Sequence, residues 1–256
     1  MTEKLGVKIA HESDRAEWRF AYYGPGERMA PHRHDLAHFS LVMAGVQREA
    51  SRGESVDTGG QWMAFKPRNF RHENEFGPDG ALLLSITLRR AGEDDEEIAA
   101  DAWRVRPAQA VRREWSALVR ALTMAAIDGE RIEDLTDDIL AALLSDDARP
   151  SRRTPPYWLK RAREAVIEGR LSSAAIARDA KVHRVHLSRA YKAHFGVTLS
   201  EDRRRARLGR AAREIIYDRS SLGAASISSG YADQAHLTRD MRAATGMTPK
   251  TLSRLF

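Results

Sequence analysis

The stretch HLSRAYKAHFGVTLS, which begins at His186, returns fifty residues later as HLTRDMRAATGMTPK, which begins at His236. Without a gap, the two stretches share His, Leu, Arg, Ala, Gly and Thr at six positions. The segments before them also align, AAIARDAKV from Ala174 with AASISSGYA from Ala224. Each copy has the pattern of a short helix, a tight turn and a longer basic helix, so the chain contains one supersecondary unit twice.

The repeat predicts two helix-turn-helix units, over about residues 171–196 and 221–246, within an all-helical region over 157–256. In each unit a glycine, Gly196 or Gly246, follows the last turn of the longer helix. Glycine closes a helix at low cost because it adopts the left-handed conformation without a β-carbon. A long basic helix is expected to join the two units.

The net positive charge of the chain comes entirely from its C-terminal part. From Ser151 to the end there are 22 Lys and Arg against 9 Asp and Glu, whereas the rest holds 20 against 27. A net charge of +13 beside −7 is typical of a polyanion-binding region joined to an ordinary soluble domain, since phosphate neutralisation supplies most sequence-independent affinity for nucleic acid. On charge alone, a solvated basic surface without a partner is the alternative.

One face of the longer helix in each unit has the residues that a DNA reader needs. In the first unit, positions 185, 188, 189 and 192 share a face at i, i+3, i+4 and i+7. Arginine on such a face forms two hydrogen bonds with a guanine edge, and glutamine does so with adenine. A lone surface arginine usually has no partner, but matched arginines in a repeat favour a functional role. The predicted DNA-contacting residues are Arg184, Val185, Ser188, Arg189 and Lys192, and in the second unit Gln234, Ala235, Thr238, Arg239 and Arg242.

This region resembles the DNA-binding domain of the AraC/XylS family of bacterial transcription regulators. The resemblance covers 157–256 and is most specific in IARDAKVHRVHLSRAYKAHFGVT, RARLGRAAREI and SGYADQAHLTRDMRAATGMTPKTL. It implies two readers on a rigid joining helix, in successive major grooves of double-stranded DNA, about 34 Å apart. It also allows a contact with RNA polymerase. The arginines of the joining helix are assigned to phosphates and solvent: Arg203, Arg204, Arg205, Arg207 and Arg210.

The sequence departs from the family pattern at several positions. Asp202 stands where an aromatic residue is usual, and Lys181 where a glycine is. In the second unit, Met241 and Thr245 replace aromatics and Ser226 replaces a small apolar residue. Because each lost aromatic removes burial that contributes about 1–3 kcal/mol, we expect a softer second core. The resulting hypothesis gives the first unit most of the base-specific contact and the second unit mainly phosphate affinity.

Short strand-like runs fill the N-terminal part, 1–92. Trp18, Phe20 and Tyr22 alternate with Arg19 and Ala21, which is the pattern of a half-buried strand. Further runs are Phe39–Met43, Val46–Ala50, Trp62–Phe65 and Ala81–Leu88, separated by turn residues at Gly24–Gly26, Ser51–Gly53, Thr58–Gly60 and Gly77–Gly80. Short strands at this spacing predict an antiparallel β-barrel or double sheet.

Helical periodicity replaces the strand pattern over 93–147. Two apolar stripes define two amphipathic helices: Trp115, Leu118, Val119 and Leu122, then Ile132, Leu135, Ile139 and Leu143. The stripes either pack on the barrel or form a homodimer interface. A charged, proline-rich linker follows over 148–156. The expected fold class is α+β with two domains, in which the antiparallel barrel and its two helices precede the all-α domain.

Four histidines gather in the predicted barrel: His32, His34, His38 and His72. Their spacing, G-x5-H-x-H-x3-H-x6-G and then P-x-N-x2-H, resembles the two motifs of the cupin family, with His38 where the metal-binding form has Glu and Asn69 where it has Gly. His32, His34 and His38 share strand parity, and converging neutral imidazoles suit zinc, nickel, copper or iron(II). A divalent metal ion, an organic effector in the same pocket, and histidines that only line the barrel all stay open.

The leading hypothesis is a sequence-specific transcription regulator whose cupin-like domain senses a small effector or a metal ion. The alternative is a metal-dependent cupin enzyme, a dioxygenase or isomerase, fused to a DNA-binding domain. His38 argues against the enzyme, because the usual iron oxygenase triad includes a carboxylate. No catalytic residue is assigned. The third interpretation is a constitutive regulator whose barrel only dimerises.

The chain has no cysteine, which excludes disulfides and thiolate metal sites. Its N-terminus lacks the apolar core of a secretory signal, and the apolar run from Ala81 to Ile86 is far too short to span a bilayer. We therefore expect a soluble cytoplasmic protein without a membrane partner.

Overall fold

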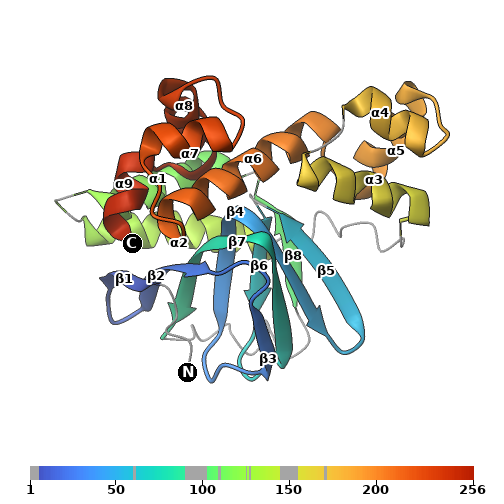
Figure 1. Ribbon diagram of the computed structural model, residues 1–256. Coiled ribbons are helices and arrows are strands. Elements are labelled where there is room, and N and C mark those ends of the chain that lie inside the picture. Colours follow the sequence, from blue (N-terminus) through green and yellow to red (C-terminus); the bar gives the residue numbers. More distant parts are fainter. Residues whose placement is uncertain are drawn as a thin grey trace.

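The computed structural model describes residues 6–59, 62–89, 103–108, 111–124, 126, 128–144, 155–169 and 172–256. The strands are β1 (Val7–Glu12), β2 (Ala16–Tyr23), β3 (Arg28–His32), β4 (His38–Ser51), β5 (Glu54–Gly59), β6 (Trp62–Lys66), β7 (His72–Leu88) and β8 (Arg104–Pro107). The helices are α1 (Arg112–Thr123), α2 (Gly129–Leu144), α3 (Tyr157–Glu168), α4 (Ser173–Asp179), α5 (Arg184–Phe195), α6 (Leu199–Ile216), α7 (Leu222–Ser228), α8 (Gln234–Thr245) and α9 (Pro249–Leu255). In Figure 1, α6 crosses above the strands, and α3–α5 stand to one side.

The two longest strands, β4 and β7, form the centre of an antiparallel sheet with the order β1-β2-β7-β4-β6-β8. β3 pairs with the first half of β7, and β5 with the second half of β4. The expected runs Phe39–Met43 and Val46–Ala50 therefore belong to one strand, and the turn expected at Gly77–Gly80 lies inside β7. These expectations were wrong because glycine bends both strands here without ending them.

At the bend, the backbones of β4 and β7 approach each other closely. Gly45 (φ 82°) and Gly80 (φ 65°) both have left-handed backbone, and a β-carbon on Gly45 would collide with the Gly80 carbonyl oxygen. The pairing register shifts on both sides of Gly45. Glycine allows both the conformation and the approach. As a result, the parity of the residues that face the inside of the β-domain changes along β4.

α1 and α2 cover the outer face of the sheet. The whole α1 stripe is buried, as are Ile132, Ile139 and Leu143 of α2, in one core with Phe39 and Phe65. This burial assigns the stripes to packing within the chain. β8, which pairs with β6, was missed within the segment expected to be helical. Its four residues, RVRP, are too few and too polar to show a strand period.

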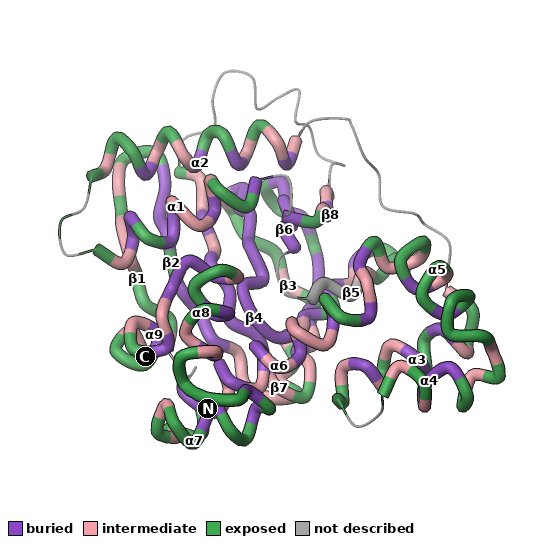
Figure 2. Tube along the Cα trace, turned by 90° about the horizontal axis from the view of Figure 1, so that it is seen from above, coloured by how far each residue is buried: buried purple, intermediate pink, exposed green. Residues whose placement is uncertain are grey.

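The hydrophobic core continues from the β-domain into the second half of the helical region. Figure 2 marks the buried residues of the strands and helices in purple. Leu208 of α6 and Leu237 and Met241 of α8 belong to the same buried cluster as the sheet and α1. α3–α5 and the start of α6 form a separate cluster. The domain boundaries inferred from the sequence stay predictions, and most of the expected linker 148–156 lies outside the described residues.

α6 crosses the sheet at the glycine bend. A β-carbon on Gly209 of α6 would lie 3.0 Å from the Cα atom of Gly45, so the two backbones nearly touch. Arg213 of α6 lies 3.9 Å from the Asp79 carboxylate of β7. The expected fold class is confirmed: an antiparallel β-domain, two helices that cover it, and an all-α C-terminal region. Within the described ranges, no helix has the length and apolar character that a membrane crossing requires.

Candidate DNA-binding surface and histidine cluster

The first helix-turn-helix unit consists of α4, a turn and α5. Ser172 caps α4 through its hydroxyl, and His183 caps α5 through Nδ1. α5 ends at Gly196, whose φ is 70°. Leu187 and Tyr191 of α5 are buried against α3 and α4, so the opposite side of α5 faces outward.

The second unit consists of α7, a turn and α8, and it repeats these features. Ser221 caps α7, and Asp233 caps α8 by accepting a hydrogen bond of 2.6 Å from the backbone N–H of His236. α8 ends at Gly246, whose φ is 80°. α5 and α8 both have 12 residues. The predicted pair of helix-turn-helix units is therefore confirmed.

The two units align only with a one-residue insertion that the sequence comparison missed. α5 and α8 begin 50 residues apart, whereas α4 and α7 begin 49 apart. Lys181 (φ 53°) therefore corresponds to Gly230 (φ 81°), and the extra residue follows Tyr231. The gapless alignment from Ala174 and Ala224 was wrong by one position, because alanine and other small residues recur along both short helices.

Both predicted recognition faces are open to solvent. The exposed residues are Arg184, Val185, Ser188, Arg189 and Lys192 of α5 and Gln234, Ala235, Arg239 and Arg242 of α8. Thr238 is half-buried, and its hydroxyl donates to the Gln234 carbonyl oxygen at 2.8 Å. Across the part of the chain that the structure describes, neither Arg189 nor Arg239 has an ion pair or a side-chain hydrogen bond. Their guanidinium groups are therefore available to a ligand.

The arginines of α6 have partners within the protein, so their assignment to phosphates stays a prediction. The partners are Ser173 for Arg203, Asp240 for Arg204, Asp202 for Arg205, the Gly230 carbonyl for Arg207 and the Ile167 carbonyl for Arg210. α6 lies between the two units, so long side chains on different faces reach either one. Apart from the pair of Arg205 with Asp202, which lies within α6, these contacts fix the joining helix to both units.

A buried network of tyrosine, carboxylate and arginine supports each unit. In the first, the Tyr191 hydroxyl donates to Asp202 at 2.7 Å, and Arg163 donates to the same carboxylate at 3.3 Å. In the second, the Tyr231 hydroxyl donates to Asp240 at 2.9 Å. Burial, reinforced by the adjacent carboxylate, raises the pKa of both tyrosines, which stay protonated donors. Asp202, which replaces an aromatic residue, is thus a satisfied buried acceptor.

The second unit has fewer aromatic residues but a larger core. Met241 and Thr245 are buried beside α1, and the Thr245 hydroxyl donates to the Met241 carbonyl oxygen at 2.8 Å. Arg112 of α1 donates to the Ala243 carbonyl oxygen at 2.7 Å. The expectation of a softer second core stays a prediction, but it overlooked α1, a neighbour that is distant in sequence.

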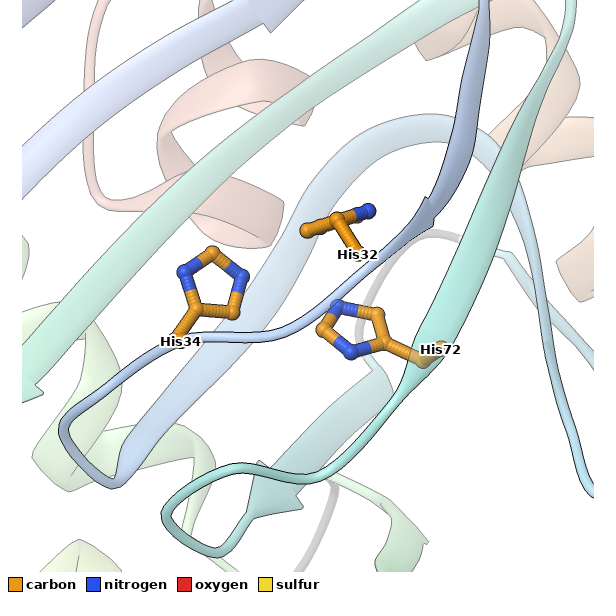
Figure 3. Close-up of side chains that lie close together, drawn as sticks. All are labelled: His32, His34 and His72. Atoms are coloured by element: carbon orange, nitrogen blue, oxygen red, sulfur yellow. The ribbon is translucent and has the colours of Figure 1, made fainter.

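Three histidines of the β-domain converge, and of these His72 is buried, His32 is half-buried and His34 is exposed (Figure 3). Ring nitrogens of His32, His34 and His72 lie within 4.8 Å of one another, and the pairing of His32 with His72 between β3 and β7 sets this approach. His38 lies beside them, with ring centroids 4.2 Å from His34 and 5.9 Å from His72. The structure thus brings all four predicted residues together, with His38 at the edge of the group.

The hydrogen bonds of the cluster leave ring nitrogens available to a metal ion. Nδ1 of His32 and Nδ1 of His72 each contact the carbonyl oxygen two residues earlier, at 2.8 and 3.1 Å. A neutral ring that donates from Nδ1 accepts at Nε2, and Nε2 of His32 is buried without a partner among the described residues. Burial, then the Lys66 ammonium, lowers the pKa of His72 to about 3 and that of His38 well below its usual value. These neutral imidazoles fit a zinc-like ion.

A buried polar network beside the histidines was missed by the sequence analysis. Lys66 is 2% exposed, lies 3.2 Å from the Glu49 carboxylate and donates to the Ser40 hydroxyl at 3.4 Å. Ser40 precedes the bend in β4 and Glu49 follows it, so their opposite parity hides the set from an alternation pattern. In the sequence, the network was indicated only by Lys66, which ends the otherwise apolar run of β6.

A family model of a helix-turn-helix domain matches residues 176–254. No curated protein sequence matches the chain. Among solved structures, ToxT from Vibrio cholerae is similar over 94% of this chain and 99% of its own, at 10% identity and a TM-score of 0.38. A cupin superfamily protein from Desulfitobacterium hafniense is similar over 33% of this chain and 77% of its own, at 16% identity and a TM-score of 0.31. These likenesses assign no ligand to this chain.

The matched region runs from α4 to α9 and contains both helix-turn-helix units with α6 between them. Two exposed basic helices on one joining helix are the arrangement that the AraC/XylS resemblance implied. Residues 176–254 therefore form a helix-turn-helix domain of the AraC type.

Proposed function

We propose that this chain is a transcription regulator that reads DNA through α5 and α8, and that its histidine cluster senses a metal ion or a small effector. The observation that carries the first half is the matched pair of exposed faces, on which Arg189 and Arg239 have no partner in the described structure. Arginine at such positions binds guanine edges, and Lys192 and Arg242 add affinity for phosphates.

Binding of the full-length protein to the genomic DNA that it enriches tests this half. Arg189→Ala and Arg239→Ala should each weaken binding to the enriched segment about fivefold or more, because a bidentate contact of arginine with guanine contributes about 1–3 kcal/mol. Arg161→Ala is the matched control, since Arg161 is exposed on α3 and not on a recognition helix. Unchanged affinity in both recognition-helix variants would contradict the proposal.

The sensing half rests on the buried, unpartnered Nε2 of His32 beside His34 and His72. These three side chains would coordinate the ion. The ion would thereby link the end of β3 and the loop after it to β7. β7 also carries Asp79, which faces Arg213 of α6. A ligand can change DNA binding only if it has different affinities for two arrangements of the protein, and β7 connects the cluster to the joining helix.

Metal analysis of the purified full-length protein tests this half. We expect about one ion per chain, and its loss in His32→Ala and His72→Ala. His11→Ala is the control because His11 is on β1, outside the cluster. DNA affinity with added zinc and with a chelator then measures the coupling. A metal-free protein whose DNA affinity responds neither to zinc nor to His32→Ala would contradict the metal and leave an organic effector.

A homodimer is part of the same proposal. The stripes of α1 and α2 are buried within the chain, so a second copy would contact another surface. Light scattering at the concentrations used for DNA binding should give twice the chain mass of 28.7 kDa. A monomeric mass, with and without DNA, would contradict it.

A further inference from the structure

The two recognition helices have matching side chains at structurally equivalent positions. The pairs are Val185 with Ala235, Ser188 with Thr238, Arg189 with Arg239 and Lys192 with Arg242. α5 and α8 have the same length, each begins at a side-chain cap, and each ends at a left-handed glycine. The match is therefore one of structure as well as of sequence. At the first helical position the two readers differ, with Arg184 in α5 and Gln234 in α8.

These side chains are free to meet bases, in contrast to the arginines of α6. Val185 is 49% exposed, so its side chain is accessible to a base. Arg184, Arg189 and Arg239 have no ion pair or side-chain hydrogen bond within the described ranges. The second unit also packs against α1, a neighbour that its assignment mainly to phosphates did not take into account.

Each pair indicates the same base in both grooves. Arginine forms bidentate bonds with O6 and N7 of guanine, so Arg189 and Arg239 indicate a guanine each. Small apolar side chains contact the methyl group of thymine, which suits Val185 and Ala235. At the first helical position the chemistry differs, because arginine selects guanine whereas glutamine selects adenine.

We propose that one protein molecule reads two similar boxes of DNA, each with a guanine and a thymine at equivalent positions. The boxes differ at one base pair, which is read by Arg184 in the first box and by Gln234 in the second. α6, which has 18 residues, joins the two units, and two readers in successive major grooves would place the boxes about one helical turn apart. This inference rests on the proposed DNA-reading function.

Selection of binding sites by the full-length protein from random duplex DNA tests the inference. We expect enriched sites with two related boxes whose centres are about 10 base pairs apart. Enriched sites with one box, or with two unrelated boxes, would overturn the inference while the proposed function stands. Selection that enriches no sequence would instead overturn the proposed function.

Exchange of the distinguishing residues gives the sharper test. Arg184→Gln should change the preferred base of the first box from guanine to adenine, and Gln234→Arg should make the reverse change in the second box. Each change should alter discrimination about fivefold or more, and Arg161→Gln should leave both boxes unchanged. Replacement of the shared thymine by uracil, which removes only the methyl group, should weaken wild-type binding but not that of Val185→Gly at the first box. Unchanged base preference in both exchange variants, or no effect of uracil, would overturn the proposal.

Discussion

The two helix-turn-helix units present the same recognition surface but have different neighbours. The first unit completes its core with α3, whose Leu159, Ala162 and Val166 are buried in a cluster apart from the rest. The second completes its core with α1 and the β-domain, through Leu237 and Met241. A short helix-turn-helix cannot bury its apolar face alone. Its stability therefore depends on whichever neighbour covers that face.

The buried polar networks of the two units also differ in which element supplies the tyrosine and which supplies the carboxylate. In the first unit the recognition helix supplies the tyrosine, Tyr191, and α6 supplies the carboxylate of Asp202. In the second unit the recognition helix supplies the carboxylate of Asp240, and the turn supplies Tyr231. Different sequence positions thus form the same arrangement of buried donor and acceptor.

The largest expected effect comes from truncating the central leucine of each unit. Leu187→Ala and Leu237→Ala should each destabilise by about 3–5 kcal/mol, because each leaves a cavity in a packed core. Leu187→Ala should melt the first unit before the β-domain, whereas Leu237→Ala should lower the melting temperature of the β-domain itself. Tryptophan fluorescence and circular dichroism follow the two transitions. A single transition shared by both parts in Leu187→Ala would contradict the separate core of the first unit.

Loss of the buried carboxylates should have a smaller effect that differs between the units. Asp202→Ala leaves Tyr191 and Arg163 without their acceptor and should cost about 3 kcal/mol. Asp240→Ala should cost about 1–2 kcal/mol, because its partner Arg204 is 41% exposed and can turn to water. Urea unfolding measures both. Asp202→Asn, which keeps one acceptor, should fall between wild type and Asp202→Ala, and an equal loss in the two alanine variants would count against the difference.

The contact of α6 with the bent strand should respond to a single methyl group. Gly209→Ala places a β-carbon 3.0 Å from the Cα atom of Gly45 and should destabilise by about 1 kcal/mol, despite the better helix propensity of alanine. Gly223→Ala in α7 meets no atom within 4 Å and should stabilise by up to about 1 kcal/mol. Thermal unfolding compares the two variants. Equal stabilisation of both would show that α6 does not pack closely on β4.

The smallest expected effect lies in the turn of the first unit. Lys181 has a φ of 53°, where its counterpart in the second unit is Gly230. Lys181→Gly should stabilise the first unit by about 1 kcal/mol or less, because glycine adopts the left-handed backbone conformation of this position without the steric strain of a β-carbon. Gly230→Ala should destabilise the second unit by a similar amount. A destabilised Lys181→Gly protein, seen in the melting of α3–α5, would contradict this equivalence of the turns.

Features that depend on local pattern could be predicted from the sequence. The recognition helices, their glycine ends and the histidine cluster follow from spacing that a repeat or a strand parity reveals. Features that depend on distant partners could not. Several α6 arginines bind partners that are distant in sequence, and Met241 shares a core with α1. The local sequence around these residues does not indicate either contact.

Local backbone events account for the remaining errors. The bend at Gly45 changes strand parity, so the alternation pattern did not place Lys66 and Glu49 beside the histidines. The one-residue insertion after Tyr231 changes the turn but leaves both helices intact, so a gapless repeat concealed it. A glycine within apolar sequence marks both a turn and a bend, and only the pairing of strands distinguishes them.

Native-state hydrogen exchange on the full-length protein tests most directly whether the two readers differ in their support. The amides of α4 and α5 should open together at a free energy below that of global unfolding, because their core is separate. The amides of α8 should open with β4 and β7, whose core they share. Exchange of α8 at the lower free energy of α5, while β4 and β7 stay protected, would contradict this account.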